Sequence, residues 1–578
     1  MAFDGIVTKA ITTEISELCG ARIDKIFQPN KNTIILGMYL NGNNYALNIC
    51  IEAQNCRINL TTKPKQNPQN APNFCMLLRK NLIGLKLKNI ITFDLERLIM
   101  IEFEGFDDID DIISKKIVIE LMGKHSNFIL LDEQNIIIDS LRHIKEINEN
   151  YRDILPHTKY LFPTSNKISF LDLKNFDDFK KYIQITSLND LSTQISNTFN
   201  GISKSFINAI INKFEIKEIN NSNLEIIFNY INEIINSIGT NKLYFTKIEN
   251  EKRNIKDYFL TLTKSNETFS LNFFIDDFYY NKETNETFRN YRNTLLKLIL
   301  DTLKKYNKRL SNINEKLQEC NDMEKYRIYG ELITANLYKI PNKNLDEIEL
   351  ENYYDNNNKI SIKLDKRYSP SINAKRFFKK YSKLKNALEI VSKQKKETIK
   401  ELDYIESVVY ELENCTSIND VTEIFEEISE NEIFKEKTTK SNNTKKSKVK
   451  KSKLTKNKTV SFNPIKYTID GYTILVGRNN KENDYLTLKY ANKNDLWFHT
   501  KDFHGSHIIL KINNNMDYPN NDLLIKTAKI AATHSKAKNS SNVPVDYCEV
   551  KFVKKPSGAK PGMVIYNNNK TLNVNPNS

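Results

Sequence analysis

Two heptad-patterned segments in the middle of the chain restrict its fold more than any other feature. Apolar residues recur in both at alternating intervals of three and four, the spacing that lines one side of a long helix. The first segment has Leu296, Ile299, Leu303, Tyr306, Leu310, Ile313, Leu317 and Cys320 at these positions, and the second has Phe377, Tyr381, Leu384, Leu388, Val391, Lys395, Thr398, Leu402, Ile405, Val409 and Leu412.

The insert between these segments lacks the heptad pattern, so the chain can fold back on itself there. We therefore expect an intramolecular antiparallel coiled coil, with helices several tens of Å long at about 1.5 Å per residue. Two packed helices of an ordinary bundle are the alternative. Lys395 and Thr398 interrupt the apolar seam, as a kink or a partner contact would.

The N-terminal part, to about residue 165, predicts an α+β unit. Helical patterns cover Thr8–Cys19 and Phe74–Leu82, and the turn at 41–44 is typical of a hairpin. Strand-like runs cover Ile23–Phe27, Thr33–Leu40, Tyr45–Ile51, Ile90–Phe93, Arg97–Phe103, Lys116–Leu121, Asn127–Asp132 and Ile136–Asp139.

Residues 170–240 are predicted to be mostly helical, and the turn Phe199–Ser203 opens one of these helices. Such a Gly-Ile-Ser turn could belong to a helix-hairpin-helix, a module that binds a backbone phosphate through the amides of a helix N-terminus. An ordinary helical turn is the simpler interpretation.

The C-terminal part begins with a lysine-rich stretch at 435–458. Its low hydrophobicity and like charge predict a disordered linker, and contact with RNA phosphates is the alternative. A second compact unit follows from about residue 460. Strands are expected at Tyr472–Arg478, Tyr485–Lys489 and Ile508–Ile512, a helix at Leu523–Lys536 and a final strand at Glu549–Val553.

Composition narrows the class of protein. A chain of 578 residues is too long for one core, so three to five domains are expected. The net charge of +15 favours a polyanionic partner, although an AT-rich genome would also enrich Lys, Asn and Ile. Seven scattered cysteines without a C-x-x-C pair fit a reducing cytosol. The N-terminus lacks the regions of a signal peptide, and no apolar run reaches a membrane span, so we expect a soluble cytoplasmic protein.

One C-terminal stretch, Asp495–His507, concentrates groups that suit a nucleic-acid-facing surface. It holds the single tryptophan and three of the seven histidines, and the basic run Val553–Gly562 follows it. Aromatic and imidazole rings stack on bases, and lysines neutralise phosphates. His499, His504 and His507, with Asp495 or Asp502, could alternatively bind a metal, but their spacing differs from H-E-x-x-H and no cysteine is near.

The chain lacks the sequence motifs of several common enzyme classes. Ser506 has no G-x-S-x-G elbow around it, and neither a P-loop nor a G-x-G-x-x-G occurs. In the N-terminal part, Asp4, Glu96 and Arg97 are the polar positions of interest. By itself, an isolated Glu-Arg pair is most often a surface ion pair that contributes little.

A set of motifs distributed along almost the whole chain resembles the NFACT family. The motifs are Phe3–Ile6, Ile23–Pro29, Phe74–Lys80, Glu120–Asn127, Gly330–Asn336, Asn373–Ala374, Tyr381–Lys385, Val476–Asn480, Asp495–His507, Val545–Tyr547, Lys554–Pro556 and Met563–Tyr566. Together, in this order, they are highly specific. The resemblance implies a multidomain α+β protein with a glycosylase-like NFACT-N domain (1–168), a helical helix-hairpin-helix region (169–285), a long antiparallel coiled-coil arm in a middle domain (286–434), a basic linker (435–460) and an α+β NFACT-R RNA-binding domain (461–578).

The resemblance also implies a role in ribosome-associated quality control. Such proteins bind stalled large ribosomal subunits that carry peptidyl-tRNA, through rRNA and stalk-base proteins. They recruit alanyl-tRNA and promote alanine tailing of the nascent chain without mRNA, while the ribosome performs peptidyl transfer. We therefore expect no catalytic residue, no metal or cofactor, and a monomer; whether a small RNA-binding partner drives translocation stays open.

The site residues that the resemblance implies fall into two groups. The tRNA-binding group is Asp4, Glu96, Arg97, Glu120, Met122, Lys124 and His125, and the RNA- or ribosome-binding group is Arg478, Asn479, Asp495, Trp497, His499, Lys501, Ser506, His507, Lys554, Lys555 and Lys560. Three positions depart from the family pattern: Glu96 replaces an aspartate, His504 a proline and His157 a glycine.

Two further functions are weighed against this one. Some family members are described as fibronectin-binding, so a surface adhesin is an alternative, against which the missing signal peptide and anchor count. A generic RNA-binding scaffold is another. DNA glycosylase activity is improbable, because Ala2 rather than a proline nucleophile follows Met1 and no four-cysteine zinc finger occurs.

Overall fold

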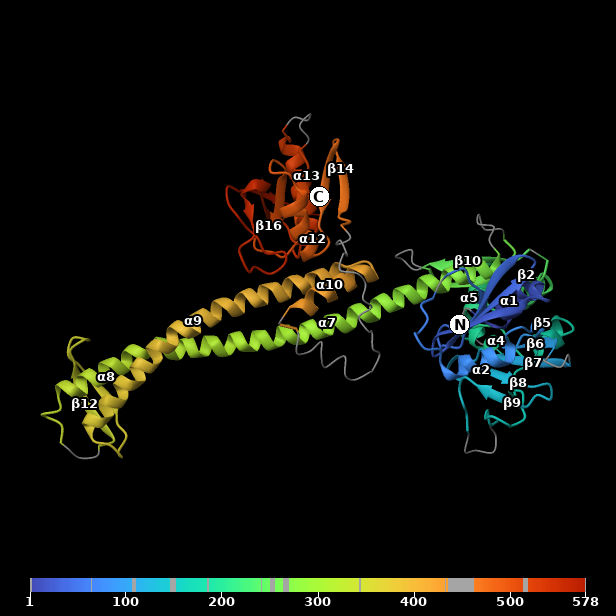
Figure 1. The fold of residues 1–578 in the computed structure, drawn as a ribbon, viewed down its shortest axis with the longest axis horizontal. Coiled ribbons are helices and arrows are strands. Elements are labelled where there is room, and N and C mark those ends of the chain that lie inside the picture. The colour runs from blue at the N-terminus through green and yellow to red at the C-terminus, as the bar shows by residue number, and fades with distance from the viewer. Residues whose placement is uncertain are drawn as a thin grey trace. The chain divides into compact units, whose positions relative to one another are not determined.

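The computed structural model divides the chain into two compact units, Met1–Thr284 and Asn285–Ser578 (Figure 1). It describes residues 3–63, 65–106, 111–145, 152–184, 187–240, 242–249, 255–263, 270–341, 345–431, 433–434, 462–512 and 518–576. The predicted lysine-rich linker at 435–460 lies outside these residues.

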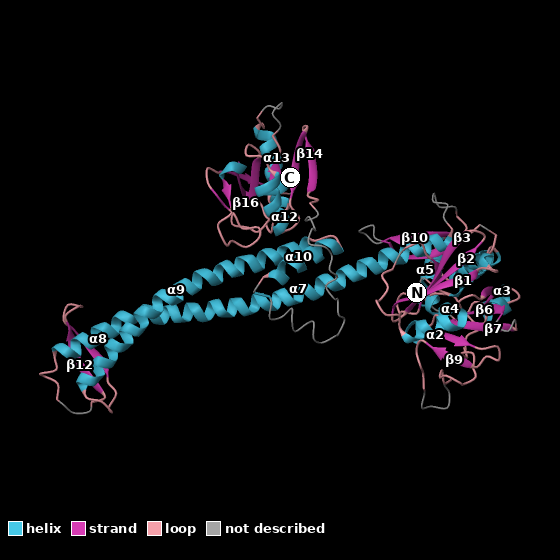
Figure 2. Ribbon diagram, viewed as in Figure 1, coloured by secondary structure: helices cyan, strands magenta, loops and turns pink. Residues whose placement is uncertain are grey.

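A nine-stranded antiparallel sheet is the largest element of the first unit, and Figure 2 shows it as magenta arrows. Its spatial order is β4-β3-β2-β1-β5-β6-β7-β8-β9. The strands are β1 (Arg22–Asn30), β2 (Thr33–Leu40), β3 (Asn43–Cys50), β4 (Arg57–Leu60), β5 (Lys86–Thr92), β6 (Leu98–Phe106), β7 (Ile112–Glu120), β8 (Asn127–Leu131) and β9 (Ile137–Ser140). All eight strands predicted in this region are confirmed. Asn41 and Gly42 both have positive φ, as a tight hairpin turn requires.

Strands β6 to β8 are buried on both faces. Because side chains alternate across a strand, Phe128 and Leu130 enter the main core while Ile129 and Leu131 enter a second, smaller cluster. The main core also receives the apolar face of the first helix. This two-sided burial explains why these strands are almost continuously apolar in sequence.

The helices of the first unit pack into the main core, on one side of this sheet. They are α1 (Gly5–Ile15), α2 (Asn73–Leu82), α3 (Phe176–Lys181), α4 (Leu188–Thr198), α5 (Lys204–Lys213) and α6 (Asn221–Asn236), followed by the hairpin β10 (Tyr244–Glu249) and β11 (Ile255–Thr261). The predicted helices at the N-terminus and at 170–240 are confirmed. Ser203 caps α5 by accepting a hydrogen bond from the backbone of Phe206, so the turn Phe199–Ser203 does open a helix.

Two long helices form an antiparallel pair in the second unit, and Figure 1 shows them side by side. They are α7 (Leu271–Asn321), which enters from the first unit, and α9 (Pro370–Asn414). Arg292 donates to the carbonyl of Leu412, and further along Arg309 pairs with Glu401. Residue numbers thus rise along one helix as they fall along the other, which confirms the predicted antiparallel helices. We call the pair formed by α9 and residues 285–321 the arm.

The insert between the heptad segments forms the far end of the arm. It contains α8 (Met323–Ala335) and the hairpin β12 (Glu347–Asn352) and β13 (Asn358–Lys363). Gly330 of α8 packs directly on the ring of Phe378 in α9. The interrupted position Thr398 is fully buried, and its hydroxyl has no hydrogen-bond partner among the described residues. Helix α10 (Ile418–Glu430) follows the other end of α9.

The C-terminal domain contains a six-stranded antiparallel sheet of order β14-β15-β17-β16-β18-β21. Its elements are β14 (Ile465–Ile469), β15 (Tyr472–Val476), α12 (Asn480–Tyr485), a π-helical turn (Leu486–Tyr490), β16 (Leu496–Thr500), β17 (Ile508–Leu510), α13 (Asn521–Thr533), β18 (Val543–Glu549), β19 (Val553–Lys554), β20 (Ile565–Tyr566) and β21 (Lys570–Val574). Strands β15 and β17 and helix α13 confirm their predictions.

Two predictions for this domain were wrong. The expected strand Tyr485–Lys489 is helical, because the Asn479 side chain caps a helix that buries Leu486 and exposes Leu488. The expected final strand Glu549–Val553 is mostly a single 3₁₀ turn after β18, and the last strand of the sheet is β21. Across the described residues, no helix is long and apolar enough to cross a membrane.

Candidate RNA-binding sites

A cavity of about 540 Å³ in the first unit lies where the start of α1, the loop before β6 and the turn before α5 meet. We call it the N-terminal cavity. It is lined by Asp4, Gly5, Leu95, Glu96, Arg97, Met122, Pro163, Thr164, Ser165, Lys167, Ser196, Asn200, Gly201, Ile202, Ser203 and Lys204. Four of the seven predicted tRNA-binding residues are therefore brought together: Asp4, Glu96, Arg97 and Met122.

Three backbone segments meet at this cavity too closely for side chains. A Cβ added to Gly5 would lie 1.7 Å from the carbonyl oxygen of Leu95 and 2.5 Å from the Cα of Gly201. Gly201 itself has a φ of +76°, a conformation that favours glycine. The backbone N–H of Gly5 donates to the carbonyl of Gly201 at 3.0 Å. These contacts fix the positions of the neighbouring polar residues on all three segments.

Asp4 is the N-cap of α1 and is buried. Its Oδ1 accepts from the backbone N–H of Val7 at 3.1 Å, and its Oδ2 accepts from the hydroxyl of Ser203 at 2.7 Å. Burial raises the pKa of Asp4 from its ordinary 3.8 to about 6, even though both hydrogen bonds favour the charged form. A carboxyl with such a pKa next to a cavity is typical of a functional position.

Glu96 and Arg97 lie half-buried beside it. Glu96 Oε1 accepts from Asn200 Nδ2 at 2.7 Å, and burial raises the pKa of this carboxyl. Lys167 donates to the carbonyl of Ser196 at 2.6 Å, and burial together with the charge of Arg97 lowers the pKa of its amine. An asparagine from the turn before α5 thus holds the carboxylate of Glu96 in place.

The other three predicted tRNA-binding residues do not line the cavity. Glu120 is buried, where it accepts from Arg152 Nη2 at 2.7 Å and from the hydroxyl of Tyr160 at 2.8 Å. Lys124 and His125 are exposed on the short 3₁₀ turn that follows Met122. Glu120 therefore holds the structure around β7, while the two basic residues extend the surface beside the cavity.

The lining combines hydrogen-bond acceptors and cations. Carboxylate oxygens accept from the amino and imino groups of bases, asparagine both donates and accepts, and Arg97, Lys167 and Lys204 can neutralise phosphates. Such a mixture suits an unstacked nucleotide of an RNA. Sequence reasoning missed Lys167, Asn200 and Ser203, although the Gly-containing turn that carries the last two was recognisable as a signal.

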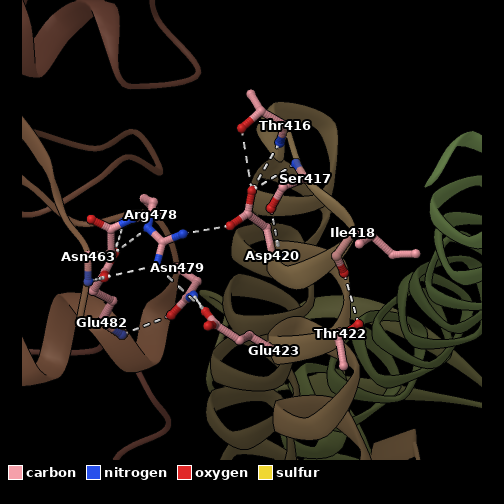
Figure 3. A network of polar contacts seen from close by, with 10 residues as sticks. All are labelled: Thr416, Ser417, Ile418, Asp420, Thr422, Glu423, Asn463, Arg478, Asn479 and Glu482. Atoms are coloured by element: carbon pink, nitrogen blue, oxygen red, sulfur yellow. Dashed lines mark hydrogen bonds and ion pairs between the residues drawn. The ribbon is translucent and has the colours of Figure 1, made fainter. Parts of the chain in front are cut away.

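In the C-terminal domain, Arg478 is held by a network of carboxylates that Figure 3 shows. Its guanidinium donates to Glu482 of its own domain at 3.1 Å and to Asp420 of α10 at 2.7 Å. Asn479 donates to Glu423 at 2.8 Å while its oxygen caps α12. Both predicted RNA-binding residues therefore already have acidic partners in this structure.

Two of the rings predicted to face RNA, those of Trp497 and His507, lie inside the domain, while His499 is half-buried and lines a cavity of about 500 Å³. Trp497 has no exposed surface, and its ring stacks on His499 at a centroid distance of 5.6 Å. His507 is buried, with Nδ1 2.8 Å from the hydroxyl of Thr487. Burial lowers the pKa of His499 to about 4 and that of His507 to about 3, so both rings are neutral. In this conformation Trp497 and His507 pack in the core rather than stack on bases, and His499 stays partly exposed.

Asp495 and Ser506 are likewise placed by internal contacts. Asp495 is fully buried and accepts from Lys511 Nζ at 2.6 Å and from the backbone of Ile512 at 2.9 Å. Ser506 donates its backbone N–H to the carbonyl of His534 at 3.0 Å. Among the residues that the structure describes, no three histidine, cysteine or acidic side chains are arranged to hold a metal ion.

The predicted lysines lie at the surface. Lys501 and Lys554 are exposed, while Lys555 pairs with Asp484 and Lys560 donates to Asn431 at 2.9 Å. The C-terminal domain thus offers cations on its surface over a core of aromatic and imidazole rings. That arrangement can bind a phosphate backbone without reading its sequence.

The chain belongs to the NFACT family: the model of the NFACT N-terminal and middle domains matches residues 4–448, and that of the NFACT protein RNA binding domain matches residues 458–568. The resemblance found in the sequence is thereby confirmed. Two bacterial proteins named Rqc2 homolog RqcH are similar along the whole chain. The one from Bacillus subtilis is 33% identical over 595 residues, and the one from Streptococcus suis is 32% identical over 582, each match covering 100% of this chain and 98% of the relative.

Similar solved structures cover about half of the chain. The fibrinogen binding protein from Staphylococcus aureus is 30% identical, with a TM-score of 0.41, and the match covers 48% of this chain and 99% of that one. The C-terminal part of a fibronectin/fibrinogen-binding protein from Streptococcus suis is 32% identical, with a TM-score of 0.37, over 50% of this chain and 95% of that one.

Proposed function

We propose that this protein is a cytoplasmic, monomeric factor of ribosome-associated quality control. It binds a stalled large ribosomal subunit that carries peptidyl-tRNA, recruits alanyl-tRNA and promotes mRNA-independent addition of a C-terminal alanine tail that marks the nascent chain for degradation. The observation that carries the proposal is the match of both NFACT family models along almost the whole chain. The net charge of +15 suits partners made of RNA.

In this proposal the N-terminal cavity binds the tRNA. Its two carboxyls and Asn200 would recognise base edges, and Arg97 and Lys167 would neutralise the backbone. Exposed Lys124 and His125 would extend the contact beyond the cavity. The surface lysines of the C-terminal domain would bind rRNA.

The protein would act by positioning rather than by chemistry of its own. Peptidyl transfer stays with the ribosome, and holding an aminoacyl-tRNA in the correct place replaces a bimolecular encounter by an ordered one, which lowers the barrier substantially. The glycosylase-like character of the first domain and a helix-hairpin-helix at α4 and α5 belong to this proposal as well, since an amide-rich helix N-terminus would bind tRNA phosphate.

The test is to purify the tagged protein from its native cells at moderate salt and to sequence the RNA that comes with it. We expect large-subunit RNA and one alanine tRNA, with the tRNA lost in a variant that combines Glu96→Ala and Arg97→Ala. A matched control removes the exposed Arg22–Asp24 ion pair, which also deletes one cation and one carboxylate. It should retain both RNAs.

Each other outcome favours another function. Large-subunit RNA without any tRNA would leave a ribosome-binding scaffold. Recovery of neither RNA would contradict the proposal and favour the fibronectin-binding adhesin. Loss of tRNA in the control as well would show that the effect is not specific to the cavity.

A further inference from the structure

The end of the arm next to the C-terminal domain is acidic. Helix α9 contributes Glu406 there, and α10 contributes Asp420, Glu423 and Glu430. We call these four side chains the acidic arm base. Facing them is a basic edge of the C-terminal domain formed by Arg478, Lys481 and Lys536. The two surfaces belong to the same compact unit.

Arg478 is at the centre of the contact (Figure 3). Its Nη1 lies 2.7 Å from Asp420 Oδ1, and its Nη2 lies 4.0 Å from Glu423 Oε2. Asn479 donates to the same Glu423 at 2.8 Å. Glu482 of the same domain also binds the guanidinium at 3.1 Å, so one carboxylate partner of Arg478 does not come from the arm.

Two further ion pairs flank this centre. Lys481 Nζ lies 2.9 Å from Glu430, and Lys536 Nζ lies 3.1 Å from Glu406. His504 Nε2 lies 3.6 Å from the same Glu406. Two lysines also donate to neutral asparagine side chains near the same contact: Lys538 to Asn414 at 3.2 Å and Lys560 to Asn431 at 2.9 Å.

The chemistry of this contact resembles that between a protein and a nucleic-acid strand. Cations that would neutralise phosphates each point at a carboxylate, and an arginine meets an acid through its fork, as it would meet a phosphate. The flanking pairs are partly solvated, with Glu430 73% exposed and Glu406 41% exposed. Such pairs contribute little individually. An RNA strand can replace them because its linked phosphates meet several cations at once and release counterions.

We propose that the acidic arm base occupies the RNA-binding edge of the C-terminal domain as an intramolecular substitute for phosphate, so that RNA must displace the arm to bind there. Docked, the domain hides Arg478, Lys481 and Lys536 from RNA; undocked, it presents them together. A cationic domain is thereby prevented from holding arbitrary RNA. The proposal rests on the proposed function only in taking RNA as the competitor.

The experiment compares three full-length proteins. The opened variant carries Glu406→Gln, Glu423→Gln and Glu430→Gln, which keep side-chain size and remove three charges. The control carries Glu397→Gln, Glu413→Gln and Glu426→Gln, which remove the same charge from exposed positions of the same two helices. The probe is a short fluorescein-labelled single-stranded RNA of mixed sequence, titrated at several salt concentrations.

We expect the opened variant to bind the probe about tenfold more tightly than the wild type, since three partly exposed ion pairs no longer compete. The control should gain at most about twofold, from the general loss of negative charge. In the wild type, saturating RNA should accelerate hydrogen exchange in α10 as the arm base is released.

Equal affinities of the opened variant and the control would overturn the proposal, as would unchanged protection of α10 at saturating RNA. These results would leave RNA binding, and hence the proposed function, intact. Failure of all three proteins to bind RNA would instead contradict the RNA-binding role of the domain and overturn both. Adding Lys481→Ala and Lys536→Ala to the opened variant should return its affinity to the level of the wild type or below, which shows that the gain uses these lysines.

Discussion

The raised pKa of Asp4 makes a quantitative prediction about stability. The folded pKa is about 6 and the ordinary value is 3.8, so the unfolded chain releases this proton at lower pH than the folded chain. Stability from this group is therefore complete below pH 3.8 and is lost as pH rises through about 6. At about 1.4 kcal/mol per unit, the full loss is about 3 kcal/mol.

The perturbation is Asp4→Asn, which keeps a good N-cap and the shape of the side chain but cannot ionise. About half of the loss falls between pH 5 and 7.5, so over this range the wild type should lose about 1.4 kcal/mol relative to the variant. All other titratable groups are common to both proteins. The difference between their stability profiles against pH therefore reports on Asp4 alone.

The assay is native-state hydrogen exchange of the amides of α1, because a chain of several domains has no single unfolding free energy. The opening constant of α1 in the wild type, relative to that in the variant, should rise about tenfold from pH 5 to 7.5. The partly exposed Asp24 of β1, which is paired with Arg22, supplies the control: Asp24→Asn should follow the wild type. Parallel pH profiles for the wild type and Asp4→Asn would refute the assigned pKa and its cause.

Four other predictions test separate features. Gly5→Ala should destabilise α1 by about 3 kcal/mol, because the added Cβ meets backbone atoms that cannot move aside, and unchanged exchange in α1 would contradict this. Glu120→Ala leaves the buried hydroxyl of Tyr160 and one donor of the half-buried Arg152 without their acceptor and should cost about 3 kcal/mol, measured by exchange in β7. His157→Gly should raise the melting temperature of the first unit, because a φ of +68° costs histidine about 1 kcal/mol more than glycine; a lower temperature would argue against strain at this position. Lys501→Ala and Lys554→Ala should each reduce the salt dependence of RNA binding by about one unit of slope, and an unchanged slope would exclude that lysine from phosphate contact.

The sequence predicted those elements whose periodicity is strong. The two heptad segments span many turns, so their apolar seam could be recognised with little ambiguity, and the alternating strands of the first unit were equally clear. The segment Tyr485–Lys489 was misinterpreted because a short run of alternating apolar residues fits both a strand and a helix. The cap Asn479 with Glu482 three residues later was the signal that favoured a helix.

Prediction of the candidate sites from the sequence was limited for a different reason. The residues of the N-terminal cavity come from positions near 4, 96, 122, 167 and 200, and only close backbone contacts bring them together. The sequence could suggest Asp4, Glu96 and Arg97 through family resemblance but could not place Asn200 beside them. In the C-terminal domain, composition alone could not distinguish Trp497 and His507 stacked on bases from the same two residues packed in a core.

Because α7 and α9 run antiparallel, their two lengths together set the length of the arm. The chain runs out along α7 and back along α9. Removing seven residues from each helix at facing positions would therefore shorten the arm by about 10 Å and keep the apolar seam in register. Removing two residues from one helix alone would instead rotate the rest of its seam by about 200°, away from the partner helix. The length of the arm can therefore change in evolution only in steps of whole heptads. Each step requires matched deletions or insertions in two segments that are far apart in sequence.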